Sequence, residues 1–167
     1  MKKVFLIFVA GDKNHNKVYN MTENADGQTF TIEYGRVGNS LTKETYSIGR
    51  WNSKYNEKLR KGYKDVTDLY KEGSDKDISF SNISPEVASL FQTLMKYTSD
   101  SVKTNYNFNT STVTQAQIDE AQKALYGLSK AMSVQYRQKF AEELFSIFPR
   151  KMHKVVDYIP TIHWDDV

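Results

Sequence analysis

The chain has 167 residues, of which 39% are hydrophobic and 26% are charged, as expected of a folded globular protein. It contains no cysteine, which excludes disulfides, thiolate metal sites and a cysteine nucleophile. The formal net charge of +3 is too small to indicate a nucleic-acid partner by itself, so the distribution of charge matters more. The histidines, His15, His153 and His163, lack the spacing of metal ligands, and we expect no metal site and no cofactor.

The apolar run at residues 4–10 follows two lysines and has the outline of a short signal peptide. It lies at the lower limit of length, and residues 11–13 do not supply the small residues of a cleavage site. A buried first strand is the better interpretation. No stretch of the sequence is long enough to cross a membrane. We therefore expect an intracellular protein, in the cytoplasm, nucleoid or nucleus, with no membrane partner.

The first part of the chain has the alternating pattern of an antiparallel sheet. Residues 24–27 end in Asp-Gly, the signal of a hairpin turn. From Trp51 to Leu59 the apolar spacing becomes helical, and Gly62 ends this helix. We expect an antiparallel meander of three or four strands, at residues 4–10, 17–23 and 30–34 with a weaker one at 41–46, and residues 63–66 are a candidate for a last short strand.

The second part of the chain has helical periodicity. Residues 71–83 are polar and contain glycine and serine, which predicts a linker. Three amphipathic helices follow between residues 84 and 148: the first begins at Ser84-Pro85, the second at a capping box from Thr114 to Gln117, and the third ends at Pro149. We expect their apolar stripes to be packed core positions: Val87, Leu90, Phe91, Leu94 and Met95; Ile118, Ala121, Leu125 and Leu128; Tyr136, Phe140, Leu144 and Ile147.

These patterns together predict an α+β fold in two parts. Residues 1–70 form an N-terminal antiparallel sheet with a packed helix, residues 71–83 form the linker, and residues 84–167 form an all-α helical domain.

The end of the third predicted strand is the strongest candidate site. Gly35 and Gly38 bracket Arg36, so the backbone can turn sharply there and be approached closely. An arginine beside Tyr34 suits a phosphate or a nucleobase edge, and the alternative is an ordinary hairpin end with a solvated arginine. A basic segment of the same module makes a phosphate-facing patch plausible, although charge runs are usually solvated faces. Its cations are Arg50, Lys54, Lys58, Arg60, Lys61 and Lys64, against one acid, Glu57.

The sequence contains no catalytic motif. GxGxxG, GxxxxGK[ST], HExxH and GxSxG are all absent, and no two carboxylates pair in an apolar setting. Binding is therefore the better class of function.

The first module resembles a WGR domain, a family in which a strand ends in Trp-Gly-Arg-x-Gly and a basic helix closes with a Lys-Gly-Tyr-like turn. The matching residues here are 34–38 and 58–63. The second part is similar to the regulatory helical domain of poly(ADP-ribose) polymerases, at residues 84–94, 113–128 and 145–149. The two resemblances cover roughly residues 4–155 in the order those polymerases use. This chain departs from the pattern by having Tyr34 in place of tryptophan, and by lacking the last long helix of the regulatory domain.

The resemblance implies a module that binds DNA ends or nicks and relays the contact to the helical domain. It places Tyr34 on a sugar near a strand terminus, Arg36 between DNA and the helical domain, and Gly35 where a close approach is needed. Asn16 matches a family asparagine that contacts the DNA backbone. We expect further phosphate contacts, independent of base sequence, from Arg50, Lys58 and Lys61.

The resemblance also bears on activity and partners. The ADP-ribosyltransferase catalytic domain is absent, so we expect this chain not to be an enzyme. It is either a fragment of a longer protein or a stand-alone relative that kept the sensing half. The partner is DNA, with an ADP-ribosyltransferase or another protein as a further one. The alternative function is a protein–protein interaction module, or a regulatory fragment of an ADP-ribosyltransferase.

Overall fold

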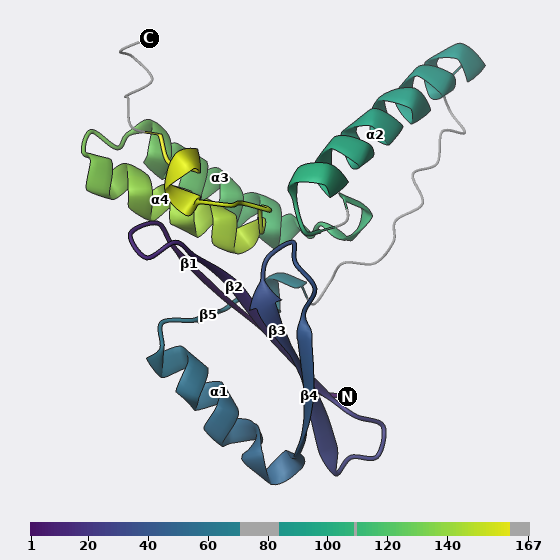
Figure 1. The fold of residues 1–167 in the computed structure, drawn as a ribbon. Coiled ribbons are helices and arrows are strands. Elements are labelled where there is room, and N and C mark those ends of the chain that lie inside the picture. Colours follow the sequence, from purple (N-terminus) through teal and green to yellow (C-terminus); the bar gives the residue numbers. More distant parts are fainter. Residues whose placement is uncertain (71–83, 109, 161–167) are drawn as a thin grey trace.

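A computed structural model describes residues 1–70, 84–108 and 110–160 and has the predicted α+β fold, with a sheet followed by helices (Figure 1). The strands are β1 (Lys3–Ala10), β2 (His15–Glu23), β3 (Thr29–Arg36), β4 (Thr42–Ser47) and β5 (Lys64–Asp65). The α-helices are α1 (Trp51–Arg60), α2 (Pro85–Asn105), α3 (Gln115–Ser129) and α4 (Val134–Ile147). Short 3-10 turns are η1 (Ile48–Arg50), η2 (Thr67–Tyr70), η3 (Thr110–Thr112) and η4 (Val155–Tyr158). The predicted linker at residues 71–83 lies outside the described residues.

The five strands form one antiparallel sheet in the order β4-β3-β2-β1-β5. Because side chains alternate between faces, the register decides which residues share a face. Tyr19 lies opposite Leu6 on β1 and opposite Tyr34 on β3, so these three side chains are on the same face. Helix α1 covers this face, and the ring of its buried Trp51 lies 5.0 Å from the ring of Phe30.

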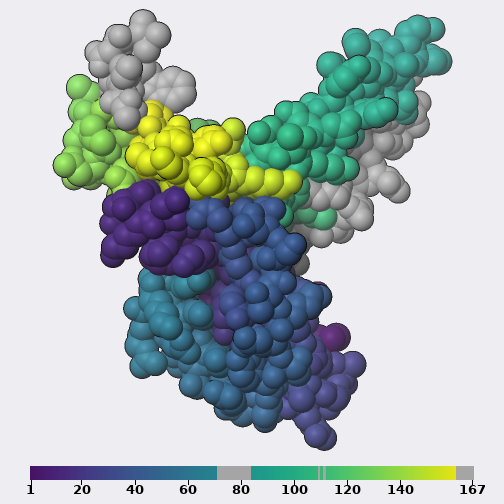
Figure 2. All heavy atoms as spheres, in the orientation of Figure 1, coloured from purple at the N-terminus to yellow at the C-terminus, as the bar shows by residue number. Residues whose placement is uncertain are grey.

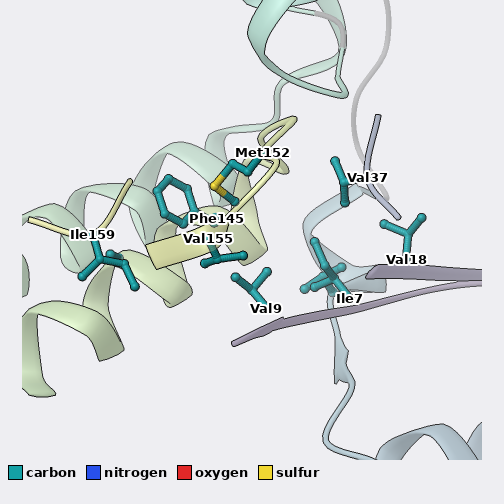
Figure 3. Close-up of a cluster of buried hydrophobic side chains, with 10 residues drawn as sticks. Ile7, Val9, Val18, Val37, Phe145, Met152, Val155 and Ile159 are labelled. Carbon is teal, nitrogen blue, oxygen red and sulfur yellow. The ribbon is translucent and has the colours of Figure 1, made fainter. Parts of the chain in front are cut away.

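The opposite face of the sheet packs against the C-terminal part of the chain. Ile7 and Val9 of β1 belong to the same buried cluster as Phe145 of α4 and Val155 of η4 (Figure 3). Apolar side chains from sequence-distant segments therefore form a common core, which fixes the position of α4 and the segment after it relative to the sheet. The boundaries at residues 70 and 84 stay a prediction.

Helices α3 and α4 pack on each other as expected, but α2 does not join them. Helix α2 projects away from the rest of the molecule (Figure 1) and has no buried residue. The prediction that its stripe is core is wrong: Val87, Leu90, Phe91, Leu94 and Met95 are 41–58% exposed. An amphipathic pattern shows that a helix has an apolar face, but it does not show which element covers that face.

The prediction that the stripes of α3 and α4 are core positions is only partly correct. In α3 Ala121 and Leu128 are buried, whereas Ile118 and Leu125 are exposed. In α4 Ile147 is buried and Tyr136 is exposed. The packed face of α3 is shifted around the helix from the predicted one, because η2 and α4 cover Gln117, Ala121, Ala124 and Leu128.

None of the described helices has both the length and the hydropathy that a membrane-spanning segment needs. Among the described residues, no group of three or more His, Asp or Glu side chains is placed to hold a metal ion.

Candidate nucleic-acid interface

Three cations line one side of α1 and its N-terminal end. Arg50, Lys54 and Lys58 are spaced by four residues, which places them on one side of a helix, and we call them the cationic row. All three lie over tyrosine rings of the adjacent structure. The Lys54 Nζ is 4.4 Å and the Arg50 Cζ 4.9 Å from the ring centre of Tyr46, and the Lys58 Nζ is 4.3 Å from that of Tyr19. The aromatic faces stabilise these charges without neutralising them.

Lys58 is the most enclosed member of the row. Its Nζ also lies 5.6 Å from the ring centre of Tyr63 and 6.0 Å from that of Tyr34. Burial, followed by repulsion from neighbouring lysines and opposed by Glu57, lowers the pKa of Lys58. In the described ranges of the chain Lys58 forms no direct ion pair, so its charge is offset only in part, by the nearby carboxylates of Glu57 and Glu44. A site of this kind attracts an anion.

Tyr34 is half-buried at the border of the row, and its orientation is fixed by Glu44. Its hydroxyl donates a 2.8 Å hydrogen bond to Glu44 Oε1, and the hydroxyl of Tyr46 donates to the other carboxylate oxygen. These two bonds, the one from Tyr46 first, hold the pKa of Glu44 below its usual value. The carboxylate therefore positions both rings, and it also reduces the positive potential of the surface beside them.

Arg36 connects the end of β3 to two distant segments. Its guanidinium donates to the backbone carbonyls of Met152 (2.9 and 3.1 Å) and His153 (2.6 Å) after α4. It also donates to the carbonyl and the side-chain oxygen of Asn14 in the β1–β2 turn (3.0 and 3.1 Å). All of these acceptors are uncharged, so the guanidinium keeps a net positive charge at this junction.

A cavity of about 300 Å³ opens beside Arg36. Among the described residues, its charged or titratable side chains are Arg36, Lys151 and His153, and none of the lining residues is a carboxylate. The turn after β3 forms one wall, and Gly38 there has a φ of +86°, which favours glycine. A Cβ at Gly38 would lie 2.6 Å from the Lys151 side chain, so this glycine leaves room for the lysine.

The chain itself approaches Gly35 closely, and the expected approach of DNA at this residue stays a prediction. A Cβ at this position would lie 3.0 Å from the side chain of Leu41, so the group that approaches it closely belongs to the chain itself. The space that glycine leaves here is filled by packing of the β3–β4 connection.

The DNA-backbone contact expected of Asn16 is not possible in this structure. Its side chain is 0% exposed, and its Nδ2 donates a 2.8 Å hydrogen bond to the carbonyl of Arg150. The backbone carbonyl of Asn16 accepts a hydrogen bond from the backbone N–H of Val37. Asn16 therefore joins β2 to the segment after α4 and does not reach the surface. The prediction failed because Arg150 is 134 residues away in the chain.

The structure brings most of the other predicted residues to one side of the molecule. Tyr34, Arg50 and Lys58 lie around α1, and Lys61 follows them as an exposed cation paired with Glu57 at 2.6 Å. Two further cations were not among the predicted site residues. Lys54 could have been predicted from the sequence, because it lies four residues from both Arg50 and Lys58. Lys17 could not, because only the register of β2 and β3 shows that it lies beside Arg36.

Protonation of His15 is expected to destabilise the fold. Burial, followed by repulsion from Lys17 and Lys13, lowers its pKa below the ordinary value of 6.5, whereas Asp12 raises it. As the pH falls, the unfolded state therefore binds the proton before the folded state does. The contribution of neutral His15 to the free energy of unfolding is complete above about pH 6.5 and decreases below it. His15→Gln should remove this component, as measured by urea denaturation at a series of pH values. An unchanged pH profile in that variant would contradict the assignment.

Comparison with known proteins adds one relative and no function. No family model matches the chain. The chain is 30% identical over 155 residues to "Uncharacterized protein 101L" of Invertebrate iridescent virus 6. The alignment covers 89% of this chain and 64% of the viral protein, so the chain spans less than two thirds of that relative's length. The name of the viral protein assigns no activity.

Proposed function

We propose that this chain is a WGR-like DNA-binding module followed by a helical region similar to part of the regulatory domain of poly(ADP-ribose) polymerases. It would bind DNA ends or nicks through phosphates and sugars and catalyse no reaction on them. The observation that supports this proposal best is the cationic row: Arg50, Lys54 and Lys58 occupy one side of α1, beside the half-buried rings of Tyr34 and Tyr46.

The composition of this surface favours the DNA backbone over base edges. Lysine side chains are compact, mobile charges that suit phosphates, and contacts of this kind carry no sequence information. Tyr34 and Tyr46 add flat apolar area beside the charges, which suits a deoxyribose or an unstacked base. Glu44 and Glu57 lie close enough to Lys54 and Lys58 to interact with them, and these two carboxylates are outnumbered by Lys17, Lys61 and the three cations of the row.

Arg36 would contribute to DNA binding from the end of this surface. Lys17 lies next to it in the neighbouring strand, and Lys17 is also close enough to Lys58 to lower the pKa of that lysine. Lys151 lines the cavity beside Arg36. A strand that followed the row past Lys17 would therefore reach the cavity, where the uncompensated guanidinium and Lys151 suit a further phosphate.

The cationic row is tested by charge reversal. Lys54→Glu with Lys58→Glu should weaken binding to a nicked duplex at least about tenfold, and it should reduce the slope of log K against log salt by about one for each phosphate that the variant no longer neutralises. Fluorescence anisotropy over a salt series measures both. The matched control is Lys96→Glu with Lys130→Glu, which changes the formal net charge equally at exposed positions of α2 and at the end of α3.

One further variant and one further DNA substrate complete the binding experiment. Lys17→Glu alters an exposed side chain and should weaken binding even if the double variant is destabilised. An intact duplex closed by hairpin loops should bind less tightly than the nicked or open-ended one. Absence of binding at low salt would contradict the proposal and favour a protein partner, and equal weakening in the control variant would leave only a general effect of net charge.

A further inference from the structure

A second cavity adjoins the one beside Arg36, and aromatic rings form part of its wall. Its volume is about 440 Å³, and we call it the aromatic cavity. Its lining residues come from the end of α2, from the segment that follows α2, and from the segment after α4: Lys103, Tyr106, Asn107, Phe108 and Lys151. Lys151 also lines the cavity beside Arg36, so the two cavities share one side chain.

The rings of Tyr106 and Phe108 are packed by residues outside the aromatic cavity. Their centres are 5.6 Å apart, and their planes meet at 62°. The ring of Phe148, which does not line the cavity, lies 4.9 Å from that of Phe108. Arg150, which does not line it either, donates a 3.1 Å hydrogen bond to the Tyr106 hydroxyl. Both rings are half-buried and line the cavity, so they form a fixed wall on which a flat ring can stack.

The permanent charges of both cavities are positive. Lys103 and Lys151 line the aromatic cavity, and Arg36 joins Lys151 in the neighbouring one. Neither set of described lining residues includes an aspartate or a glutamate. The Nζ of Lys151 donates to the carbonyl of Lys103, which places this ammonium at the last turn of α2. Because an ammonium has three donors, others remain for an anion.

The aromatic cavity lies where the base of α2 meets the segment after α4. The backbone N–H of Lys151 donates to the carbonyl of Asn105, and Tyr106 forms an isolated β-bridge with Arg150. In Figure 2 the base of α2 (teal) adjoins this segment (yellow) above the sheet. A strand that followed the cationic row to Arg36 would therefore reach the aromatic cavity next.

We propose that the aromatic cavity binds an unpaired base of a DNA end, so that the preferred substrate is a duplex with a single-stranded overhang. This inference rests on the proposed function. A phosphate of the overhang would lie between Arg36 and Lys151, and its base would stack on the wall formed by Tyr106 and Phe108. A base inside a duplex would first have to be unpaired and unstacked, which costs free energy, so the cavity favours a base that is already single-stranded.

The overhang is tested by fluorescence anisotropy of the full chain with a blunt duplex and with the same duplex extended by a short 5′ or 3′ overhang of adenines. An overhang of one polarity should tighten binding about fivefold or more, because stacking on an aromatic side chain stabilises the bound base. An overhang of abasic sites keeps the phosphates but lacks the bases, so it should lose most of this gain. 2-Aminopurine in the overhang should lose fluorescence on binding, because stacking quenches it.

Variants of the wall assign the effect to the aromatic cavity. Phe108→Ala should reduce the affinity for the overhang to that for the blunt duplex, whereas Phe108→Trp keeps a flat ring and should retain the preference. Tyr126→Ala, which removes a 68% exposed ring of α3, is the control and should also retain it. Lys54→Glu with Lys58→Glu should weaken binding to both duplexes by the same factor, so that the preference is unchanged.

The outcomes separate this inference from the proposed function. Binding to the blunt duplex without a gain from either overhang would overturn the inference and leave the proposed function intact. A gain that abasic sites or Phe108→Ala fully retain would do the same. Absence of binding to all of these duplexes at low salt would overturn both.

Discussion

Replacement of Phe145 by alanine should lower the free energy of unfolding by about 3–5 kcal/mol. Phe145 is 7% exposed and lies in the cluster between α4 and the sheet, with Ile7 and Val9 of β1 in the same cluster (Figure 3). Alanine would remove the ring and leave a cavity that the strands cannot easily collapse into. Urea denaturation followed by circular dichroism measures the decrease.

The same variant tests whether sheet and helices depend on each other. Tyr136→Ala, at an exposed position of α4, is the control and should change the free energy of unfolding by no more than about 0.5 kcal/mol. Hydrogen exchange of the β1 amides should become faster in Phe145→Ala but not in the control. Unchanged exchange in β1, together with loss of the α4 signal, would contradict a common core and indicate two parts that unfold separately.

Replacement of Arg36 by alanine should cost about 2–4 kcal/mol of folding stability. Its guanidinium makes five hydrogen bonds to Asn14, Met152 and His153, and bonds from a charged donor are stronger than neutral ones. With alanine at this position, the oxygen atoms that accept from Arg36 are left to bind water or to have no hydrogen-bond donor, which lowers the stability of the folded state. The destabilisation should concentrate at the junction of β3 with the segment after α4, as measured by urea denaturation and by limited proteolysis near residue 153.

Two further variants separate this effect from a general decrease in charge. Arg60→Ala removes an exposed arginine at the end of α1 and should have little effect on stability. Arg36→Lys keeps the charge but lacks the planar arrangement of donors, so its stability should lie between that of the wild type and that of Arg36→Ala. Equal stability of Arg36→Lys and the wild type would show that charge alone is sufficient.

Local sequence patterns predicted the local structure well. The alternation around Phe30 and Ile32, the Asp-Gly turn and the helical spacing after Trp51 correspond to β3, the β2–β3 hairpin and α1. The capping box at Thr114 is confirmed, with both of its hydrogen bonds present. These features depend on residues within a few positions of each other, so the sequence contains most of the information that determines them.

The candidate site depended on contacts that sequence patterns do not encode. Asn16 is polar and Val37 is apolar, and each lies beside a different turn of the sheet. Both are buried because the segment after α4 packs on them, through Arg150 and Met152 respectively. The acceptors of Arg36 after α4 are backbone carbonyls more than 100 residues away, and no side-chain motif identifies them. The cationic row was easier to predict, because helical spacing alone places Arg50 and Lys58 on one side of α1.

The order in which the chain is synthesised gives the common core a consequence for folding in the cell. The strands emerge from the ribosome first, whereas Phe145 and Val155, which cover Ile7 and Val9, follow more than a hundred residues later. At a synthesis rate of about 10 residues per second, Ile7 and Val9 would stay uncovered for roughly ten seconds or more before Phe145 and Val155 are synthesised. During that interval the nascent chain presents an apolar surface on which a chaperone can act, or through which unfinished chains can aggregate.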